Sequence, residues 1–205
     1  QLGFEDKQVL WGLVVPFIRD LKPAGVILDG DVVDCYSISS HRTHFDVKLE
    51  VNLRQEIEKA HELMNEFKGV KHKWWIGGNH EARWTNLIAD KVPELGVVSG
   101  LDFASVFGLA KYGFQWKPWG EFVMLGKLLV THGDIVRKHA GYTAKAHFDK
   151  YGCSVLHGHT HRVGMYLHTN IGGAHGAWEN GCLCKLDGLG YTHYPDWQQA
   201  FAVVH

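Results

Sequence analysis

The sequence lacks the features that mark membrane-spanning, secreted and nucleic-acid-coating proteins. No apolar run approaches the roughly 20 residues that a transmembrane helix requires. No charged segment followed by an apolar one opens the chain, as in a signal peptide. The 21 Lys and Arg residues nearly cancel the 22 Asp and Glu residues, so no polybasic field attracts nucleic acid or an acidic membrane surface. These absences predict a globular protein with no membrane partner.

Cysteine is scarce, and no two cysteines form a C-x-x-C pair. The four are Cys35, Cys153, Cys182 and Cys184. The Cys182-x-Cys184 spacing is tighter than that of the usual zinc knuckle, so we expect free thiols in a reducing compartment. By contrast, 15 His, 8 Trp and 24 Gly are many for 205 residues, a length that fits a single domain over residues 1–205.

The first 21 residues carry the period of an amphipathic helix. One apolar stripe recurs at helical spacing, through Leu10, Leu13, Val14, Phe17, Ile18 and Leu21. Pro16 predicts a kink or break inside this helix, and Pro23 ends it before a short strand over Gly25–Leu28.

Further elements alternate between helix and strand patterns. Helices are predicted over Val47–Lys68, Ala82–Lys91, Asp102–Leu109 and Tyr142–Lys150. Ala200–Val204 has the composition of a buried strand. Strands separated by helices favour an α/β arrangement.

Four short apolar runs each lead into a glycine-containing turn with potential metal ligands. They are Val26–Asp34, Trp74–Glu81, Leu128–Asp134 and Ser154–His161. In α/β sheets ligands collect beyond the carboxyl ends of the strands, and glycine lets the backbone turn sharply there. Two imidazoles two residues apart are unusual outside metal sites, so the last turn carries the strongest single signal.

The mixture of His, Asp and Asn side chains suits metal-dependent cleavage of phosphate esters. Two metal ions about 3.5–4 Å apart lower the pKa of bound water and clamp the substrate oxygens. Imidazole and carboxylate together favour Mn, Fe or Zn over Ca, which prefers shells made only of oxygen. We therefore expect two divalent transition-metal ions as cofactors and a small phosphoester or nucleotide as substrate.

These turns resemble the signature of the calcineurin-like metallophosphoesterase superfamily, in its small phage and bacterial form. The blocks G-D-x-x-D, G-N-H-E, H-G-D and G-H-x-H stand at Gly30–Asp34, Gly78–Glu81, His132–Asp134 and Gly158–His161. The resemblance covers nearly the whole chain and extends to Tyr36–Ser39, Glu179–Cys182 and Pro195–Gln199. It implies a two-sheet α/β sandwich flanked by helices, with the metals at one rim, in the cytoplasm of a bacterium or a phage-infected host.

The resemblance also implies the metal ligands. Asp31 is expected to bridge the two ions. Asn79, His132 and His159 are expected to complete the ligands of one ion, and His161 to serve the other.

Catalytic and supporting roles follow from the same resemblance. His80 is expected to donate a proton to the leaving oxygen, or to stabilise the transferring phosphoryl group. Asp34 is expected to hold the far nitrogen of that imidazole. Glu81 and Asp134 are expected to support their turns and not to bind metal.

One signature block of the superfamily is absent. No Asp in this chain is followed two residues later by His, so the D-x-H pair that serves the second ion has no counterpart. We expect an N-terminal truncation that removed the first strand, or a chain that holds the second ion poorly. Asp29 is a further candidate ligand. Cys35 stands where protein serine/threonine phosphatases carry Arg, which disfavours phosphoprotein substrates.

Two alternative functions remain open. The first is a nuclease acting on DNA or RNA, which the neutral net charge disfavours. The second is a non-catalytic metal-binding scaffold of the same fold. The absent block motivates the scaffold, whereas the presence of His80 and Asp34 weighs against it.

Several other polar residues have two readings. Arg83 and Arg162 are equally suited to contact phosphate or to form structural ion pairs. His41 and His44 are expected in an exposed loop, and Arg137–His139 on a solvated basic surface. His147 and four other histidines have no motif context.

Overall fold

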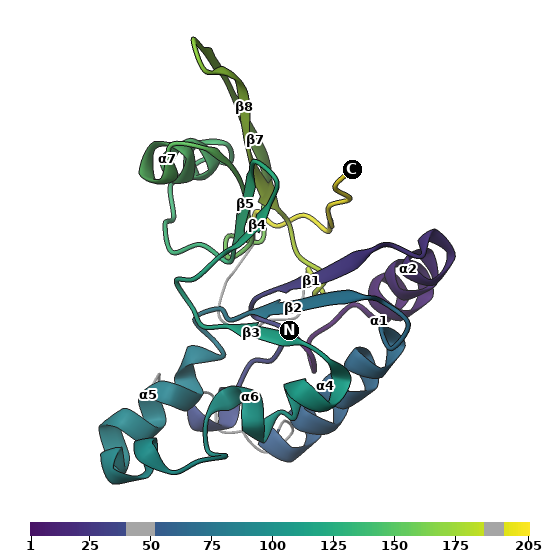
Figure 1. The fold of residues 1–205 in the computed structure, drawn as a ribbon, viewed down its shortest axis with the longest axis vertical. Helices are drawn as coiled ribbons and strands as arrows, with labels where there is room; N and C mark the ends of the chain where they lie inside the picture. The colour runs from purple at the N-terminus through teal and green to yellow at the C-terminus, as the bar shows by residue number, and fades with distance from the viewer. Residues whose placement is uncertain (40–51, 187–194) are drawn as a thin grey trace.

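The computed structural model describes residues 1–39, 52–186 and 195–205 and is a mixed α/β fold with two sheets (Figure 1). The smaller sheet is parallel throughout, with the strand order β1 (Gly25–Asp29), β2 (His72–Ile76) and β3 (Gln115–Lys117). This confirms the predicted α/β class and the strand expected from Gly25, which runs one residue longer.

The larger sheet has the order β4-β5-β6-β8-β7. Its strands β5, β6 and β8 are parallel, whereas β4 and β7 pair antiparallel at the two edges. The strands are β4 (Val123–Leu125), β5 (Leu128–Thr131), β6 (Ser154–His157), β7 (Val163–Asn170) and β8 (Gly173–Asn180). The β7–β8 hairpin projects away from the rest of the molecule (Figure 1).

Three apolar clusters hold the sheets and helices together. The first joins the smaller sheet to the helices that lie beneath it in Figure 1, around Met64, Trp75 and Phe107. The second lies between the sheets, where Ile76 of β2 packs with Leu156 of β6. The third packs α7 (Tyr142–Tyr151) on the larger sheet. The two sheets therefore share a core, with helices packed against both.

The N-terminal helix accommodates Pro16 through a π-helical turn. It consists of α1 (Lys7–Val9), the π-helix η1 (Leu10–Val14) and α2 (Val15–Leu21). The amide of Val15 donates to the carbonyl of Leu10, five residues earlier. A proline ring clashes with the carbonyl four residues before it, and the wider turn relieves that contact. The predicted break is therefore a local change of helix type.

Only part of the apolar stripe on this helix is buried. Leu10 and Val14 belong to the buried set, whereas Leu13, Phe17 and Leu21 are exposed. Phe17 and Leu21 line a cavity of about 900 Å³ that also borders β1, β6 and residues 200–205. Among the described residues, β1 pairs with a strand on one edge only.

The remaining helices follow the predictions closely, with local shifts. α4 (Leu53–Glu66) begins after Asn52, whose side chain forms a capping box with Gln55. The predicted start at Val47 lies outside the described residues. α5 (Ala82–Lys91) has the predicted bounds, and α7 is one residue longer than predicted.

The short helix predicted within Asp102–Leu109 is present. Asp102 caps α6 (Phe103–Val106), Gly108 takes a left-handed conformation, and the 3-10 helix η4 (Leu109–Tyr112) follows. Two more 3-10 helices are η2 (Tyr36–Ile38) and η3 (Pro93–Val97). The glycine ends the α-helix because it tolerates positive φ without a steric cost.

The strand predicted over Ala200–Val204 is wrong. Residues 201–205 are exposed and have no regular structure. A strand needs a hydrogen-bonded neighbour, and the pairing here stops at the single bridge between Gln199 and Cys182. The apolar composition serves a different contact, in which the ring of Phe201 packs edge-on against Phe17 at 5.4 Å between centroids.

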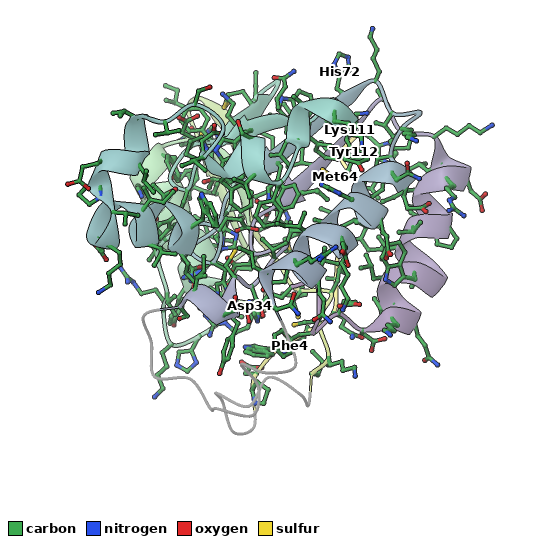
Figure 2. All side chains as sticks on the ribbon, turned by 90° about the horizontal axis from the view of Figure 1, so that it is seen from below. Phe4, Asp34, Met64, His72, Lys111 and Tyr112 are labelled. Atoms are coloured by element: carbon green, nitrogen blue, oxygen red, sulfur yellow. The ribbon has the colours of Figure 1, made fainter. Side chains whose placement is uncertain are left out.

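No helix in the described parts of the chain is long and apolar enough to cross a bilayer. The site-bearing turns follow the carboxyl ends of β1, β2, β5 and β6. Asp34, which comes after β1, lies at the opposite end of the molecule from His72, which begins β2 (Figure 2).

Candidate metal centre

Three predicted ligands from three separate turns meet in one place. Potential ligand atoms of Asp31, His132 and His159 all lie within 4.8 Å of one another. The Asp31 Oδ2 and His132 Nε2 atoms are 3.3 Å apart, and the His132 and His159 rings are 5.2 Å apart between centroids. The turns after β1, β5 and β6 thus bring one carboxylate and two imidazoles together.

Four of the five predicted ligands carry a buried polar atom with no hydrogen-bond partner among the described residues. These atoms are Asn79 Oδ1, His132 Nε2, His159 Nδ1 and His161 Nδ1. Leaving a buried acceptor unsatisfied costs about 1–3 kcal/mol, so such atoms are rare in folded proteins. Nitrogen and oxygen lone pairs left free beside a buried carboxylate fit the coordination of a divalent transition metal.

The orientation of His132 suits a metal ligand. Its Nδ1 donates to the carbonyl of Asp29 at 2.8 Å, which leaves Nε2 directed at Asp31. A hydrogen bond at one ring nitrogen fixes the tautomer and frees the other nitrogen for a metal.

The centre contains one ion pair, Asp31 with His132, and two neutral imidazoles, His159 and His161. Burial disfavours charge on Asp31, but His132 and His80 outweigh burial and hold the Asp31 pKa well below its usual range. Burial also opposes protonation of His132, yet the Asp31 carboxylate raises the His132 pKa to about 9. Burial lowers the pKa of His159, and it lowers that of His161 to about 4. The last two rings are therefore neutral near pH 7 and can donate lone pairs.

Glycine is required where the turns approach the centre. A Cβ atom on Gly78 would lie 2.2 Å from Asp31 Oδ1 and 2.8 Å from His132 Nε2. Gly30 has a φ of +74°, and a Cβ there would lie 2.2 Å from His132 Nδ1. Any larger residue at these positions occupies the space of the ligands.

Glu81 supports two ligand turns at once, as predicted. Its buried carboxylate accepts hydrogen bonds from the amides of Asp31 at 2.9 Å, Val32 at 2.8 Å and Gly78 at 2.8 Å. It thereby joins the turn after β1 to the turn after β2. Asp31 has a φ of +49°, an uncommon conformation that these bonds help to hold.

Glu56 supports the same region from α4, a role that its local sequence does not predict. Its carboxylate accepts hydrogen bonds from the amides of Asp34 at 2.8 Å and Cys35 at 2.7 Å. Burial raises its pKa to about 7. In sequence Glu56 resembles the other charged residues of α4, and only its burial at 1% exposure distinguishes it.

Replacing Glu56 with Gln is expected to change how stability depends on pH. Because the folded state raises the pKa from 4.5 to about 7, folded protein holds this proton more tightly than the unfolded chain. Wild-type stability should therefore fall as pH rises from about 4.5 to 7, by up to about 3 kcal/mol from this group. The variant lacks this loss, so it should gain stability relative to wild type between pH 5 and pH 8.

Urea unfolding at pH 5 and at pH 8, with a chelator present, measures the difference in stability between the variant and wild type. The matched control is Glu58→Gln, an exposed position on the same helix, for which the difference from wild type should be equal at both pH values. A Glu56→Gln difference that is also independent of pH contradicts the buried, protonated state of Glu56.

The His80 ring lies between two carboxylates. Its Nδ1 hydrogen-bonds to Asp34 Oδ1, and its Nε2 lies 3.8 Å from Asp31 Oδ2. Arg83 donates to the carbonyl and carboxylate of Asp34 at 2.6 and 2.7 Å. Arg83 therefore forms the structural ion pair, one of its two predicted readings, and helps to position the Asp34 carboxylate.

Arg162 also has a structural role. It donates to the carbonyls of Lys138 at 3.0 Å and Arg137 at 2.8 Å. Asp134 lies outside both groups of potential ligands among the described residues, and its carboxylate pairs with Lys150 Nζ at 2.7 Å, which joins its turn to α7. The stretch Arg137–His139 is exposed, as predicted. His41 and His44 lie outside the described residues.

A buried pair of histidines, His147 and His157, lies behind the centre, and the local sequence predicts no role for either. His147 of α7 stacks on His157 of β6 with 3.9 Å between ring centroids. A Cβ on Gly133 would lie 2.9 Å from His147 Nε2. This pair packs behind the turn that carries His132, and burial lowers the pKa of His157 to about 3.

The other predicted ligand, His161, belongs to a second group. Its potential ligand atom lies within 4.8 Å of the sulfurs of Cys182 and Cys184, which are themselves 3.2 Å apart. A hydrogen bond from Cys184 lowers the pKa of Cys182 to about 7. All four cysteines are free thiols, as predicted.

Asp29 does not join either group of potential ligands within the described residues. Both of its carboxylate oxygens are buried without a hydrogen-bond partner there, and burial raises its pKa well above the usual range. Asp29 contributes to the centre through its backbone carbonyl, which orients the His132 ring.

Comparison with known proteins gives a distant relative. No protein-family model matches the chain. The chain is similar to the Gene 54 protein of Mycobacterium phage L5, with 27% identity over 179 residues that cover 82% of this chain and 69% of that protein.

Proposed function

We propose that this chain is a metal-dependent phosphoesterase of the calcineurin-like superfamily, with the corresponding two-sheet fold. The observation that carries the proposal is the meeting of Asp31, His132 and His159 from three turns, where each imidazole has one nitrogen without a hydrogen-bond partner among the described residues. The proposed substrate is a small phosphate ester or nucleotide.

In this proposal Asp31, Asn79, His132 and His159 hold one ion, and Asp31 and His161 contribute to a second. Bound metal ions supply an activated water nucleophile and neutralise charge on the phosphoryl oxygens. Mn, Fe and Zn are the cations that suit this mixture of nitrogen and oxygen donors.

His80 supplies the proton in this mechanism. The Asp34 carboxylate accepts the hydrogen bond of His80 Nδ1 and so fixes the orientation of the ring, with Nε2 on the far side. The proton on Nε2 then faces the side of the Asp31 centre, where a leaving oxygen can take it. Arg83 keeps Asp34 in place, while Glu81 and Glu56 hold the turns that carry Asp31 and Asp34.

Hydrolysis of 4-nitrophenyl phosphate and bis(4-nitrophenyl) phosphate tests the proposal. Chelator-treated protein is expected to be inactive, and added Mn²⁺ should raise the rate at least about 100-fold, equivalent to about 3 kcal/mol. The two substrates separate monoesterase from diesterase activity.

The control is Asp149→Asn, which alters an exposed ion pair with Lys145 on α7 and should leave the rate unchanged. Wild-type protein that binds Mn²⁺ stoichiometrically but cleaves neither ester contradicts the enzymatic proposal. That result favours the scaffold alternative. Cleavage confined to oligonucleotides, with binding that weakens steeply in salt, favours the nuclease alternative.

A further inference from the structure

Two cysteines and one histidine converge beside the Asp31 centre. Ligand atoms of His161, Cys182 and Cys184 lie within 4.8 Å of one another. All three residues line the same cavity as Asp31 and His159. His161 Nδ1 is buried and has no hydrogen-bond partner in the part of the chain that is described.

Two backbone bridges hold the C-x-C pair in place. Cys182 pairs with Gln199 on one side, and Cys184 pairs with Glu5 on the other, with a bend at Leu183 between them. This arrangement leaves the two sulfurs 3.2 Å apart. The spacing is tighter than that of a zinc knuckle, but sulfurs this close can both reach one cation.

Neighbouring segments hold the group in place. The Cys182 amide donates to the carbonyl of Gln198 at 3.0 Å, and the Gln199 side chain donates to the carbonyl of Cys184 at 3.1 Å. The amide of Gln198 donates to the carbonyl of His161 at 2.9 Å. The His161 ring packs edge-on against Trp197, 4.5 Å between centroids. One short segment, residues 197–199, therefore fixes all three potential ligands.

We propose that His161, Cys182 and Cys184 form a thiolate metal position that binds a thiophilic divalent cation such as Zn²⁺. The inference builds on the proposed function, in which His161 serves the second ion, and it gives that ion two sulfur ligands from this chain. Cation binding replaces the two thiol protons, which are released to solvent. Thiolate ligands favour Zn²⁺, Co²⁺ or Cd²⁺ over Mn²⁺ or Mg²⁺.

The geometry favours chelation over a disulfide. Two sulfurs bound about 2.3 Å from one tetrahedral zinc ion lie about 3.8 Å apart, close to the 3.2 Å between Cys182 and Cys184. A disulfide requires roughly 2.05 Å between the two sulfurs, which is further from the 3.2 Å of this structure. Chelation thus needs the smaller rearrangement.

Titration of the reduced, chelator-treated protein with Co²⁺ tests the inference. Wild type is expected to develop the intense near-ultraviolet charge-transfer band of thiolate-bound cobalt, and excess Zn²⁺ should remove it while Mn²⁺ should not. The double variant Cys182→Ser/Cys184→Ser should lose the band and one bound equivalent. Cys153→Ser should keep both, because Cys153 lies outside the group.

A measurement on the unaltered protein covers the case in which the double variant fails to fold. Zn²⁺ should protect the half-buried Cys182, but not the half-buried Cys153, from alkylation by iodoacetamide, as read by peptide mass spectrometry. Absence of the band in wild type, or alkylation unaffected by Zn²⁺, overturns the inference. A thiolate band without ester hydrolysis supports the thiolate metal position and contradicts the phosphoesterase proposal. Mn²⁺-dependent hydrolysis without the band supports the phosphoesterase proposal and contradicts the thiolate metal position.

Discussion

Replacing His80 with Ala is expected to lower kcat for aryl phosphate hydrolysis by about 10²–10⁴-fold, the usual contribution of a positioned general acid. Metal content should not change, because His80 belongs to neither group of potential ligands within the described residues. The ring approaches Asp31 only to 3.8 Å and is held by Asp34 on its other nitrogen. The expected loss therefore lies in proton transfer.

The measurement compares kcat and bound Mn²⁺ per chain in the same preparations. Substrates with good and poor leaving groups sharpen the test, since a poor leaving group needs the proton more and should show the larger loss. His72→Ala is the control, because that histidine is exposed at the start of β2, whereas His80 follows the end of that strand. Equal rates in His80→Ala and wild type reject the assigned mechanism.

Replacing Asp31 with Asn is expected to weaken Mn²⁺ binding by more than the roughly 10–100-fold typical of residues that only support a ligand. Asn is nearly the same size but removes the negative charge at the centre of the group. Hydrolysis should fall with metal occupancy, so a sufficient excess of Mn²⁺ should restore the rate. Isothermal titration with Mn²⁺ measures the affinity.

The pH dependence of Mn²⁺ binding gives a second signature of Asp31. In metal-free protein the Asp31 carboxylate raises the His132 pKa to about 9, so a cation must displace that proton. Apparent affinity should therefore rise about tenfold per pH unit between pH 7 and 9 in wild type. In the variant the rise should be weaker, because burial then lowers the His132 pKa without an opposing carboxylate.

The same ion pair contributes to the stability of metal-free protein. A raised histidine pKa stabilises the fold below the unfolded value of about 6.5, and this contribution disappears as pH rises through about 9. Asp31→Asn should remove it, so the variant should be less stable than wild type at pH 6 and closer to it at pH 9. Mn²⁺ affinity that is independent of pH in wild type contradicts the proton displacement.

The candidate centre could be located from sequence because its elements are local. Glycine beside Asp, Asn and His at a strand end reflects a backbone that must turn in little space, as Gly78 does against Asp31. The bracing role of Glu81 was also accessible, since it directly follows its own turn. The ion pair of Asp134 with Lys150 was not accessible, because Lys150 lies on α7.

Residues that act across long sequence separations could not be predicted from local sequence patterns. Glu56 is one of several charged residues on α4, and only packing against the turn at Asp34 buries it. Glu179 of β8 similarly accepts from Thr160 Oγ1 at 2.7 Å and from the Gly141 amide at 2.6 Å. A buried carboxylate and a solvated one have the same local sequence signal.

The sequence by itself determined the α/β class, most helices, and the candidate ligands in the turns that follow the strands, but not Cys182 and Cys184, because periodicity, capping and turn chemistry are local. Tertiary structure alone decided how those ligands divide. It placed His132 and His159 with Asp31, but His161 with the sulfurs of Cys182 and Cys184. It also left Ala200–Val204 without a strand partner among the described residues. Both outcomes depend on which distant segments become neighbours, and the spacing of residues along the chain does not predict those contacts.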